Sequence, residues 1–196
     1  WGNLVTAMSR KLEQWWLTTA GGEVGPYDAV VVAIPAEQAA AILSLHDFAL
    51  AQKALLARSQ PCWTGMYIFD RPLDGLPPVI RHCGDIGWAA RNNAKPGRTG
   101  PEAWVVQASA GWSDSRLEDD NDDIAARLLA ALREVTGVTL AEPIAAVAHR
   151  WRFARTTHAV ADGHHFDERV QLGICVDWCS GGRVEVQIGS TLLQLA

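Results

Sequence analysis

The 196-residue chain has a formal net charge of −5, and 48% of its residues are hydrophobic. This acidic balance, without clustered Lys and Arg, argues against nucleic-acid binding. No apolar run reaches about eighteen residues, so we expect no membrane span, and no signal peptide opens the chain. Four cysteines in a chain of this size indicate buried thiols in a reducing compartment, so we expect a cytoplasmic protein.

The first elements alternate between helix and strand patterns. Residues 4–12 carry apolar side chains at helical spacing and predict a short helix. Residues 15–19 are rich in strand formers and precede a double glycine, which predicts a hairpin. Residues 27–34 are mostly β-branched and apolar, as is typical of a strand buried on both faces. Pro35 then begins a predicted helix over residues 36–45.

The middle of the chain predicts an antiparallel sheet with one long helix. A second helix is expected over residues 47–58. Short strands separated by loops rather than by helices favour antiparallel pairing, and they are predicted over residues 61–69, 86–91, 103–108 and 145–153. Residues 121–135 predict a helix with one apolar stripe and a cap at Asn121. The acidic residues 118–123 are interpreted as the solvated entrance of that helix rather than as a metal site.

The tail has the pattern of a ligand-binding edge. Residues 172–178 predict a short buried strand with the acid Asp177 at its carboxyl end, followed by a turn at Gly181 and Gly182 and a helix. In open α/β sheets, ligands bind outside the carboxyl ends of the strands. The first N–H groups of a helix there would be free for anionic or carbonyl oxygens.

Several of these motifs resemble the renalase-like bacterial flavoproteins of the flavin-containing amine oxidase superfamily. The tail, strand–Asp-Trp–Gly-Gly-Arg-Val-Glu–helix, is similar to their C-terminal flavin-binding segment. Residues 28–35, Asp-x-Val-Val-x-Ala-x-Pro, are similar to the segment that passes along the dinucleotide. Trp-Ala-Ala-Arg-Asn at 88–92 and Lys-Pro-Gly-Arg at 95–98 also resemble these proteins.

The resemblance implies FAD as cofactor and a set of contacts to it. Asp177 would bind the ribityl hydroxyls or the phosphate side of the cofactor. The glycines and the amides that follow would face the flavin pyrimidine ring. The full set of expected cofactor-binding residues is Pro35, Asp177, Trp178, Gly181, Gly182, Arg183, Val184 and Glu185.

The resemblance also implies residues near the reaction. Asn92 and Lys95 would act as catalytic residues beside the flavin ring, where an ammonium could polarise the flavin or position a water; the alternative is a solvated loop. Large aromatic side chains can line sites for flat or cationic ligands, but they serve cores first. With both alternatives open, the candidate walls of a substrate pocket are Trp63, Trp88, Trp104 and Trp151.

The predicted fold class is α/β, mixed with α+β character. A partial Rossmann-like FAD/NAD(P)-binding domain would comprise residues 1–58 and 156–196, and an antiparallel-sheet substrate domain would comprise residues 59–155. The chain contains no GxGxxG turn and begins without methionine. We therefore expect the later portion of a longer protein.

The expected function is an FAD-dependent oxidoreductase that transfers a hydride from a C–N substrate to flavin, with reoxidation by oxygen. The substrate would be a small amine or a dihydronicotinamide-like molecule. The alternatives are a non-catalytic remnant that binds no FAD and a protein-interaction domain that uses the nine tryptophans. Ser113 and Ser180 lie in no GxSxG elbow, and the adjacent His164 and His165 usually point apart on a loop, so neither a hydrolase nor a metal site is expected.

Overall fold

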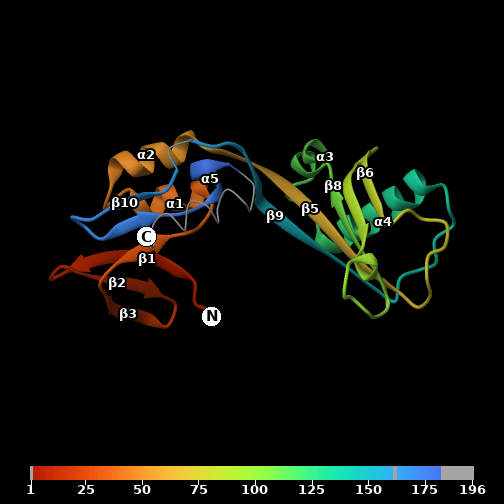
Figure 1. Cartoon of the computed structure of the whole chain (residues 1–196), viewed down its shortest axis with the longest axis horizontal. Coiled ribbons are helices and arrows are strands. Elements are labelled where there is room, and N and C mark those ends of the chain that lie inside the picture. Colours follow the sequence, from red (N-terminus) through yellow and green to blue (C-terminus); the bar gives the residue numbers. More distant parts are fainter. Residues whose placement is uncertain (1, 161–162, 182–196) are drawn as a thin grey trace. The chain divides into compact units, whose positions relative to one another are not determined.

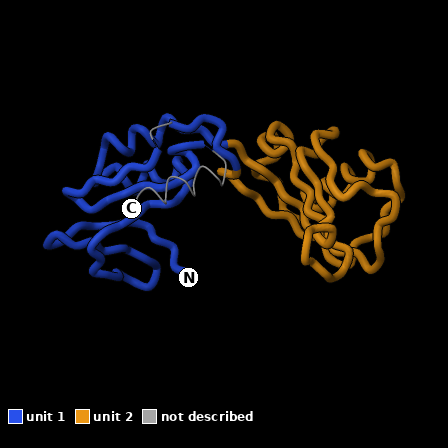
Figure 2. The backbone as a smooth tube through the Cα atoms, viewed as in Figure 1, with its two compact units in different colours: residues 1–59, 155–196 blue, residues 60–154 orange. Residues whose placement is uncertain are grey.

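The computed structural model describes residues 2–160 and 163–181 and has a mixed α/β fold with antiparallel sheets. The chain divides into two compact units (Figure 2). Unit 1 comprises Trp1–Ser59 and Arg155–Ala196, and unit 2 comprises Gln60–Ala154. What each unit binds stays a prediction. Within the described residues, no helix has the length and apolar character that a membrane crossing needs.

The described residues of unit 1 form two small sheets and three helices (Figure 1). One sheet is antiparallel, in the order β1 (Val5–Lys11), β2 (Gln14–Thr19), β3 (Gly22–Tyr27). The other has the order β10 (His165–Asp167), β11 (Leu172–Ile174), β4 (Val30–Val32), with β11 parallel to β4. The helices are α1 (Ala36–Leu43), α2 (Phe48–Leu56) and the four-residue α5 (Asp177–Ser180).

The helices of unit 1 form because their apolar spacing gives each of them one buried stripe. In α1, Ala36, Ala39, Ala40 and Leu43 are buried at positions i, i+3, i+4 and i+7. Asp47 caps α2 by accepting a hydrogen bond of 2.9 Å from the backbone N–H of Leu50. The predicted helices over 36–45 and 47–58 are therefore present, each a few residues shorter than expected.

Two expectations for unit 1 are wrong. Residues 4–12 form strand β1 rather than a helix, and Met8 lies opposite Leu17 in the ladder with β2. Met8 is buried there while Leu4 and Leu12 are exposed, so the apolar residues that suggested a helix do not pack together against the core. The run 27–34 contributes only the three residues of β4, and Val31 is 54% exposed rather than buried.

Unit 2 is built on one five-stranded sheet. Its order is β6 (Val79–Cys83), β7 (Ile86–Arg91), β8 (Glu102–Ala108), β5 (Arg58–Phe69), β9 (Ala145–His158). The first four strands pair antiparallel. Strands β5, β7 and β8 correspond to predicted strands, whereas β6 was not predicted. The remaining elements are the short turn η1 (Asn92–Ala94) and the helices α3 (Ala110–Ser115) and α4 (Asn121–Thr136).

The predicted helix over 121–135 is confirmed as α4, which supplies the core of unit 2. Ile124, Leu128 and Leu132 are buried and belong to one cluster with the aromatic side chains of the sheet. The cap is Asp120 rather than Asn121, because the Asp120 carboxylate accepts from the backbone N–H of Asp122 at 2.8 Å. Gly137 ends the helix at φ 63°, in the left-handed region that favours glycine.

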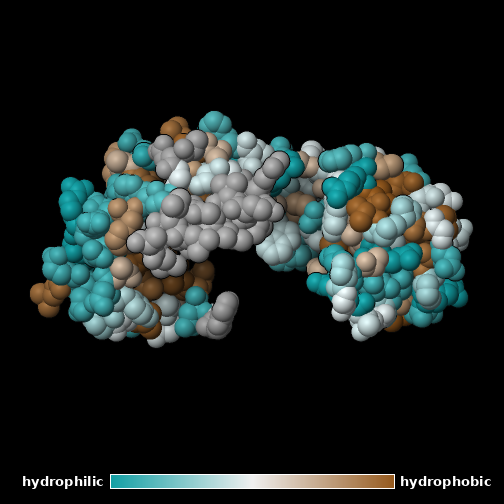
Figure 3. All heavy atoms as spheres, viewed as in Figure 1, coloured by the Kyte–Doolittle hydropathy of each residue, from teal (hydrophilic) through white to brown (hydrophobic). Residues whose placement is uncertain are grey.

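The alternation of side chains gives the sheet of unit 2 two different faces. The covered face packs on α4 and carries buried residues such as Trp63 and Trp104. The outer face carries the alternate residues of the same strands, among them the exposed Met66, Ile68 and Val79. Figure 3 shows hydrophobic surface around β6. The outer face therefore carries exposed apolar side chains that α4 does not cover.

Candidate functional site

The carboxyl ends of two parallel strands meet in unit 1. Val32 of β4 lies opposite Ile174 of β11 in the ladder, so the segments that leave both strands lie side by side. One segment leads to Pro35 and the other leads to Asp177. Their junction is fixed by the Trp178 indole, whose Nε1 donates to the carbonyl oxygen of Ile34 at 3.0 Å. The structure thus brings together three of the predicted cofactor-binding residues.

Asp177 is the only acid among those predicted cofactor-binding residues that the structure describes, and its carboxylate is held in place. Thr156 Oγ1 donates to Asp177 Oδ2 at 2.6 Å, and the backbone N–H of Trp178 donates to Oδ1 at 2.9 Å. The side chain is half-buried. Two carboxylate oxygens offer about four acceptor positions, so acceptor capacity remains for the hydroxyl groups of a ligand.

Strand β11 ends earlier than the sequence predicts. It stops at Ile174, and Asp177 is the first residue of α5 rather than the end of a strand. Val176 precedes it at φ −150° and ψ 167°, an extended conformation that any residue adopts.

The remaining predicted cofactor residues have different surroundings. Trp178 is fully buried, and its side chain packs in the core of unit 1, so its contact with the cofactor stays a prediction. The Pro35 carbonyl accepts from Gln38 and Ala39 in the first turn of α1. Gly181 has φ 123°, and an added Cβ would meet no atom within 4 Å. Gly182, Arg183, Val184 and Glu185 lie outside the described residues.

This edge fits the sugar-alcohol arm of a flavin nucleotide. A half-buried carboxylate with spare acceptor capacity suits a chain of hydroxyl groups. The space beside Gly181 is clear, and glycine adopts its positive φ without strain, so a ligand can approach the backbone there. Asp177 and Gly181 are therefore the described residues that could hold the cofactor.

In unit 2, the four candidate pocket tryptophans divide between the two faces of the sheet. Trp63 and Trp104 are buried on the covered face. The Trp63 indole donates to Arg116 O at 2.9 Å, and the Trp63 backbone N–H donates to the buried Ser113 hydroxyl at 3.0 Å. The structure therefore places these two tryptophans in the core of unit 2, and their part in a substrate pocket stays a prediction. Trp88 lies opposite Gln107 on the outer face.

A hollow opens on the outer face of unit 2. Its volume is about 340 Å³, and it is lined by Cys62, Gln107, Trp151, Phe153 and Ala154. This volume is at the lower end of the range found for small-ligand sites. The lining combines two aromatic rings with one amide. Of the four predicted pocket residues, Trp151 is the one that lines it, and its side chain is 53% exposed.

Asn92 and Lys95 lie elsewhere on unit 2. They follow Arg91, which pairs with Trp104, whereas the hollow reaches β8 at Gln107. Three strand residues correspond to about 10 Å along the sheet. Asn92 Oδ1 accepts from the Arg98 guanidinium at 2.7 Å, and Lys95 is exposed. The structure does not bring these two residues to the hollow, and their catalytic role stays a prediction.

The acid that anchors this loop is Glu102, which no sequence motif singled out. The Glu102 side chain is only 2% exposed and accepts from Trp104 Nε1 at 2.7 Å and from Asn93 Nδ2 at 3.2 Å. Arg91 Nε lies 3.0 Å from Glu102 Oε1, an ion pair without hydrogen-bond alignment. The sequence does carry a signal for its burial: Glu102 is two residues before Trp104 and four before Val106, so in a strand all three side chains lie on the same face.

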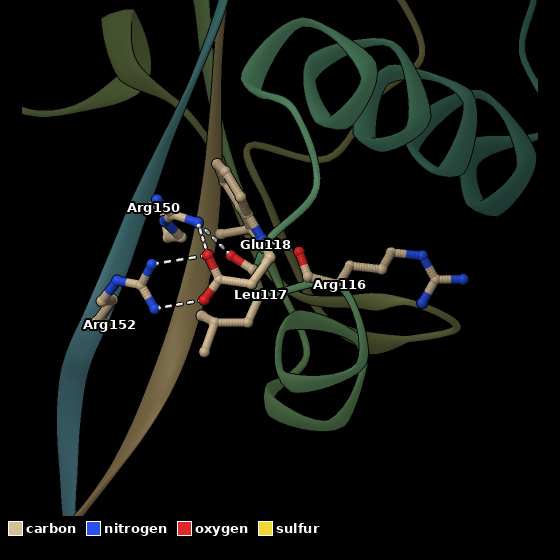
Figure 4. Close-up of polar contacts among 6 residues, drawn as sticks. Arg116, Leu117, Glu118, Arg150 and Arg152 are labelled. Carbon is tan, nitrogen blue, oxygen red and sulfur yellow. Dashed lines mark hydrogen bonds and ion pairs between the residues drawn. The ribbon is translucent and has the colours of Figure 1, made fainter.

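Glu118, the first of the acidic residues 118–123, has a structural role. Figure 4 shows Arg150 and Arg152 of β9 both pointing toward its carboxylate. Arg152 donates at 2.6 and 2.8 Å, and Arg150 donates at 2.9 Å. These arginines, Arg152 foremost through its hydrogen bonds, hold the pKa of Glu118 below its usual range. Glu118 therefore links the loop before α4 to strand β9.

The described part of the chain holds no candidate metal site. Nowhere in residues 2–160 and 163–181 do three His, Cys, Asp or Glu side chains gather closely enough to hold a metal ion. His165 belongs to strand β10 and lies opposite Ile174.

Comparison with known families decides the class of protein. The model of the family described as flavin containing amine oxidoreductase matches residues 3–173. The chain belongs to this family. A flavin-containing family implies a flavin cofactor, in agreement with the edge at Asp177.

Solved structures share this fold. The chain is similar to a provisionally assigned protoporphyrinogen oxidase from Exiguobacterium sp. 255-15, with a TM-score of 0.69 and 17% identity over 98% of this chain and 46% of that one. It is also similar to cyclohexylamine oxidase from Brevibacterium oxydans IH-35A, with a TM-score of 0.69 and 14% identity over 98% of this chain and 47% of that one. A putrescine oxidase variant with redesigned cofactor binding has a TM-score of 0.67 and 13% identity, over 98% of this chain and 48% of that one. The chain thus spans about half the length of these proteins.

Proposed function

We propose that the chain serves an FAD-dependent oxidoreductase of the amine oxidase type that acts on a small amine. The observation that carries the proposal is the Asp177 carboxylate, held by Thr156 at the carboxyl ends of β4 and β11. Family membership supports a flavin, and two of the similar structures are named as oxidases of cyclohexylamine and putrescine.

The residues of unit 1 would bind and orient the cofactor. FAD, when bound, supplies the hydride acceptor and carries the redox chemistry. Asp177 would accept hydrogen bonds from the ribityl hydroxyls, with its geometry set in advance by Thr156 and by the Trp178 amide. Gly181 would let the ligand approach the backbone. Beyond the described residues, the amides from Gly182 to Glu185 would stabilise negative charge on the pyrimidine ring.

The hollow of unit 2 would receive the substrate. Trp151 and Phe153 offer aromatic faces, which attract both apolar groups and cations. The Gln107 amide offers a donor and an acceptor that could orient an amine. The renalase-like resemblance favours dihydronicotinamides as the alternative substrate class and oxygen as the terminal acceptor. The four cysteines favour a cytoplasmic location.

Anaerobic reduction of the FAD-loaded chain tests this function. The chain is mixed with benzylamine in one series and with dihydronicotinamide mononucleotide in the other, and the visible absorbance of the flavin is followed. Bleaching by benzylamine, reversed by oxygen, is the expected result. Bleaching by the dihydronicotinamide alone would move the assignment to a renalase-like activity. Bound FAD that neither compound bleaches would contradict both and favour a non-catalytic remnant.

A further inference from the structure

Strand β9 lies at the edge of the unit 2 sheet. The strand order places β5 on one side of it, and no described strand of the sheet lies on the other. An edge strand has fewer hydrogen bonds to fix its position than a central strand has. Side-chain contacts therefore supply part of the constraint, and among them are the contacts of Arg150 and Arg152 with Glu118.

Trp151 lies between these two arginines in the sequence and points the other way. Successive side chains of a strand alternate between the faces of the sheet. Arg150 lies over the ring of the core residue Trp63, with its guanidinium carbon 5.7 Å from the ring centroid, which places the two arginines on the covered face. Trp151 is consequently on the outer face, where it lines the hollow. Its ring packs edge-to-face against the His149 ring, with 4.5 Å between the ring centroids.

We infer that Glu118 is a positioning residue for Trp151. By holding Arg150 and Arg152, it fixes the backbone on both sides of Trp151 and so sets the place of the indole at the hollow. The inference rests on the proposed function only in taking the hollow as the site of the amine. Glu118 itself does not line the hollow, and its side chain is 70% exposed.

The two arginines depend on Glu118 to different degrees. Arg150 also donates to the Leu117 carbonyl at 2.6 Å and lies over Trp63. The hydrogen bonds found for Arg152 among the described residues all go to Glu118. Loss of the carboxylate therefore releases β9 on the carboxyl side of Trp151, toward Phe153 and the hollow, while Arg150 stays attached.

The test uses the full chain labelled with 5-fluorotryptophan and observed by ¹⁹F NMR. Trp151→Phe identifies the Trp151 resonance by its loss. Glu118→Gln keeps the size of the side chain but removes its charge, and it should shift or broaden that resonance. Benzylamine should perturb the same resonance in the unsubstituted chain, and Glu118→Gln should weaken its binding about fivefold, as expected for the loss of exposed ion pairs.

Two further variants separate positioning from a general loss of structure. Glu118→Asp retains the carboxylate and should restore most of the unsubstituted behaviour. Glu142→Gln removes another exposed carboxylate of unit 2, which pairs with Arg133, and it should leave the Trp151 resonance and benzylamine binding unchanged.

The outcomes distinguish this inference from the proposed function. A Trp151 resonance that moves in Glu118→Gln supports positioning even when benzylamine fails to bind, and that failure would count against the amine site alone. A resonance and an affinity that stay unchanged in Glu118→Gln would overturn the inference even when benzylamine binds. Equal shifts in Glu118→Gln and Glu142→Gln would overturn it too, because the effect would not depend on the two arginines.

Discussion

The indole of Trp178 donates a hydrogen bond of 3.0 Å to the carbonyl oxygen of Ile34, and this bond joins two segments that are 144 residues apart in the chain. It connects the exit of β4 to the start of α5, beside Asp177. The position of the acid thus depends on a fully buried ring. The geometry of the candidate flavin edge therefore depends on packing in the core of unit 1.

Replacing Trp178 should therefore destabilise unit 1. Trp178→Phe leaves the Ile34 carbonyl without its partner and opens a small cavity, which together should cost about 2 kcal/mol of unfolding free energy. Urea denaturation measures the change. Trp151→Phe is the matched control, because its half-exposed ring should cost less than about 0.5 kcal/mol. Equal losses in the two variants would contradict the supporting role of Trp178.

Glu102 should be one of the most sensitive polar residues of unit 2. Glu102→Ala leaves the Arg91 guanidinium and the Trp104 indole without their carboxylate, and breaking such a buried pair should cost about 3 kcal/mol. Glu142→Ala, which removes the exposed partner of Arg133, should cost less than about 1 kcal/mol. Thermal unfolding of both variants compares them, and a tolerant Glu102 position would show that the network contributes little.

The hairpin between β1 and β2 offers a stabilising change. Its two-residue turn holds Leu12 at φ 51° and Glu13 at φ 69°, in the left-handed region, and Leu12 is 96% exposed. Such turns prefer Asn-Gly. Leu12→Asn combined with Glu13→Gly should raise the unfolding free energy by about 1 kcal/mol by relieving this strain. Leu45→Asn, at another exposed leucine, should leave the unfolding free energy unchanged. A gain of equal size in this variant would indicate a general surface effect.

Asp167 should contribute to stability in a pH-dependent manner. Hydrogen bonds from the Arg169 side chain and backbone N–H lower its pKa from the ordinary 3.8 to about 2. A carboxyl whose pKa is lower in the folded state stabilises the fold above the unfolded-state pKa, and this contribution disappears as the pH falls toward the folded-state pKa. Asp167→Asn should therefore be less stable than the unsubstituted chain at neutral pH, with the difference vanishing between pH 3.8 and about 2. A difference that is constant with pH in urea titrations would disprove the pairing.

Much of the fold could be predicted from local sequence. The stripe of α4 and the short strands of unit 2 follow from periodicity alone, because one face of each is buried in a single core. Residues 4–12 could not be predicted in this way. Their spacing suits a helix, but pairing with β2 provides backbone hydrogen bonds that local spacing does not report. Such tertiary pairing overrides local preference.

The candidate site could be predicted only in part. The proximity of Pro35 and Asp177 follows from the rule that parallel strands place their carboxyl ends together. The faces of the tryptophans depend on which side of the sheet α4 covers, and this is a tertiary property. Trp63 therefore lies in the core while Trp151 lies on the hollow. The partners of Glu118 are more than thirty residues away, so a run of acids could not reveal them.

The affinity of the full chain for FAD, measured by quenching of flavin fluorescence, tests the central claim most directly. Asp177→Ala should weaken binding about tenfold or more, because a charge-assisted hydrogen bond is lost. Thr156→Val, which frees the carboxylate, should weaken it less. Glu168→Ala, which removes an exposed acid between β10 and β11, should have no effect. Affinities that are equal in Asp177→Ala and Glu168→Ala would contradict a flavin site at this edge.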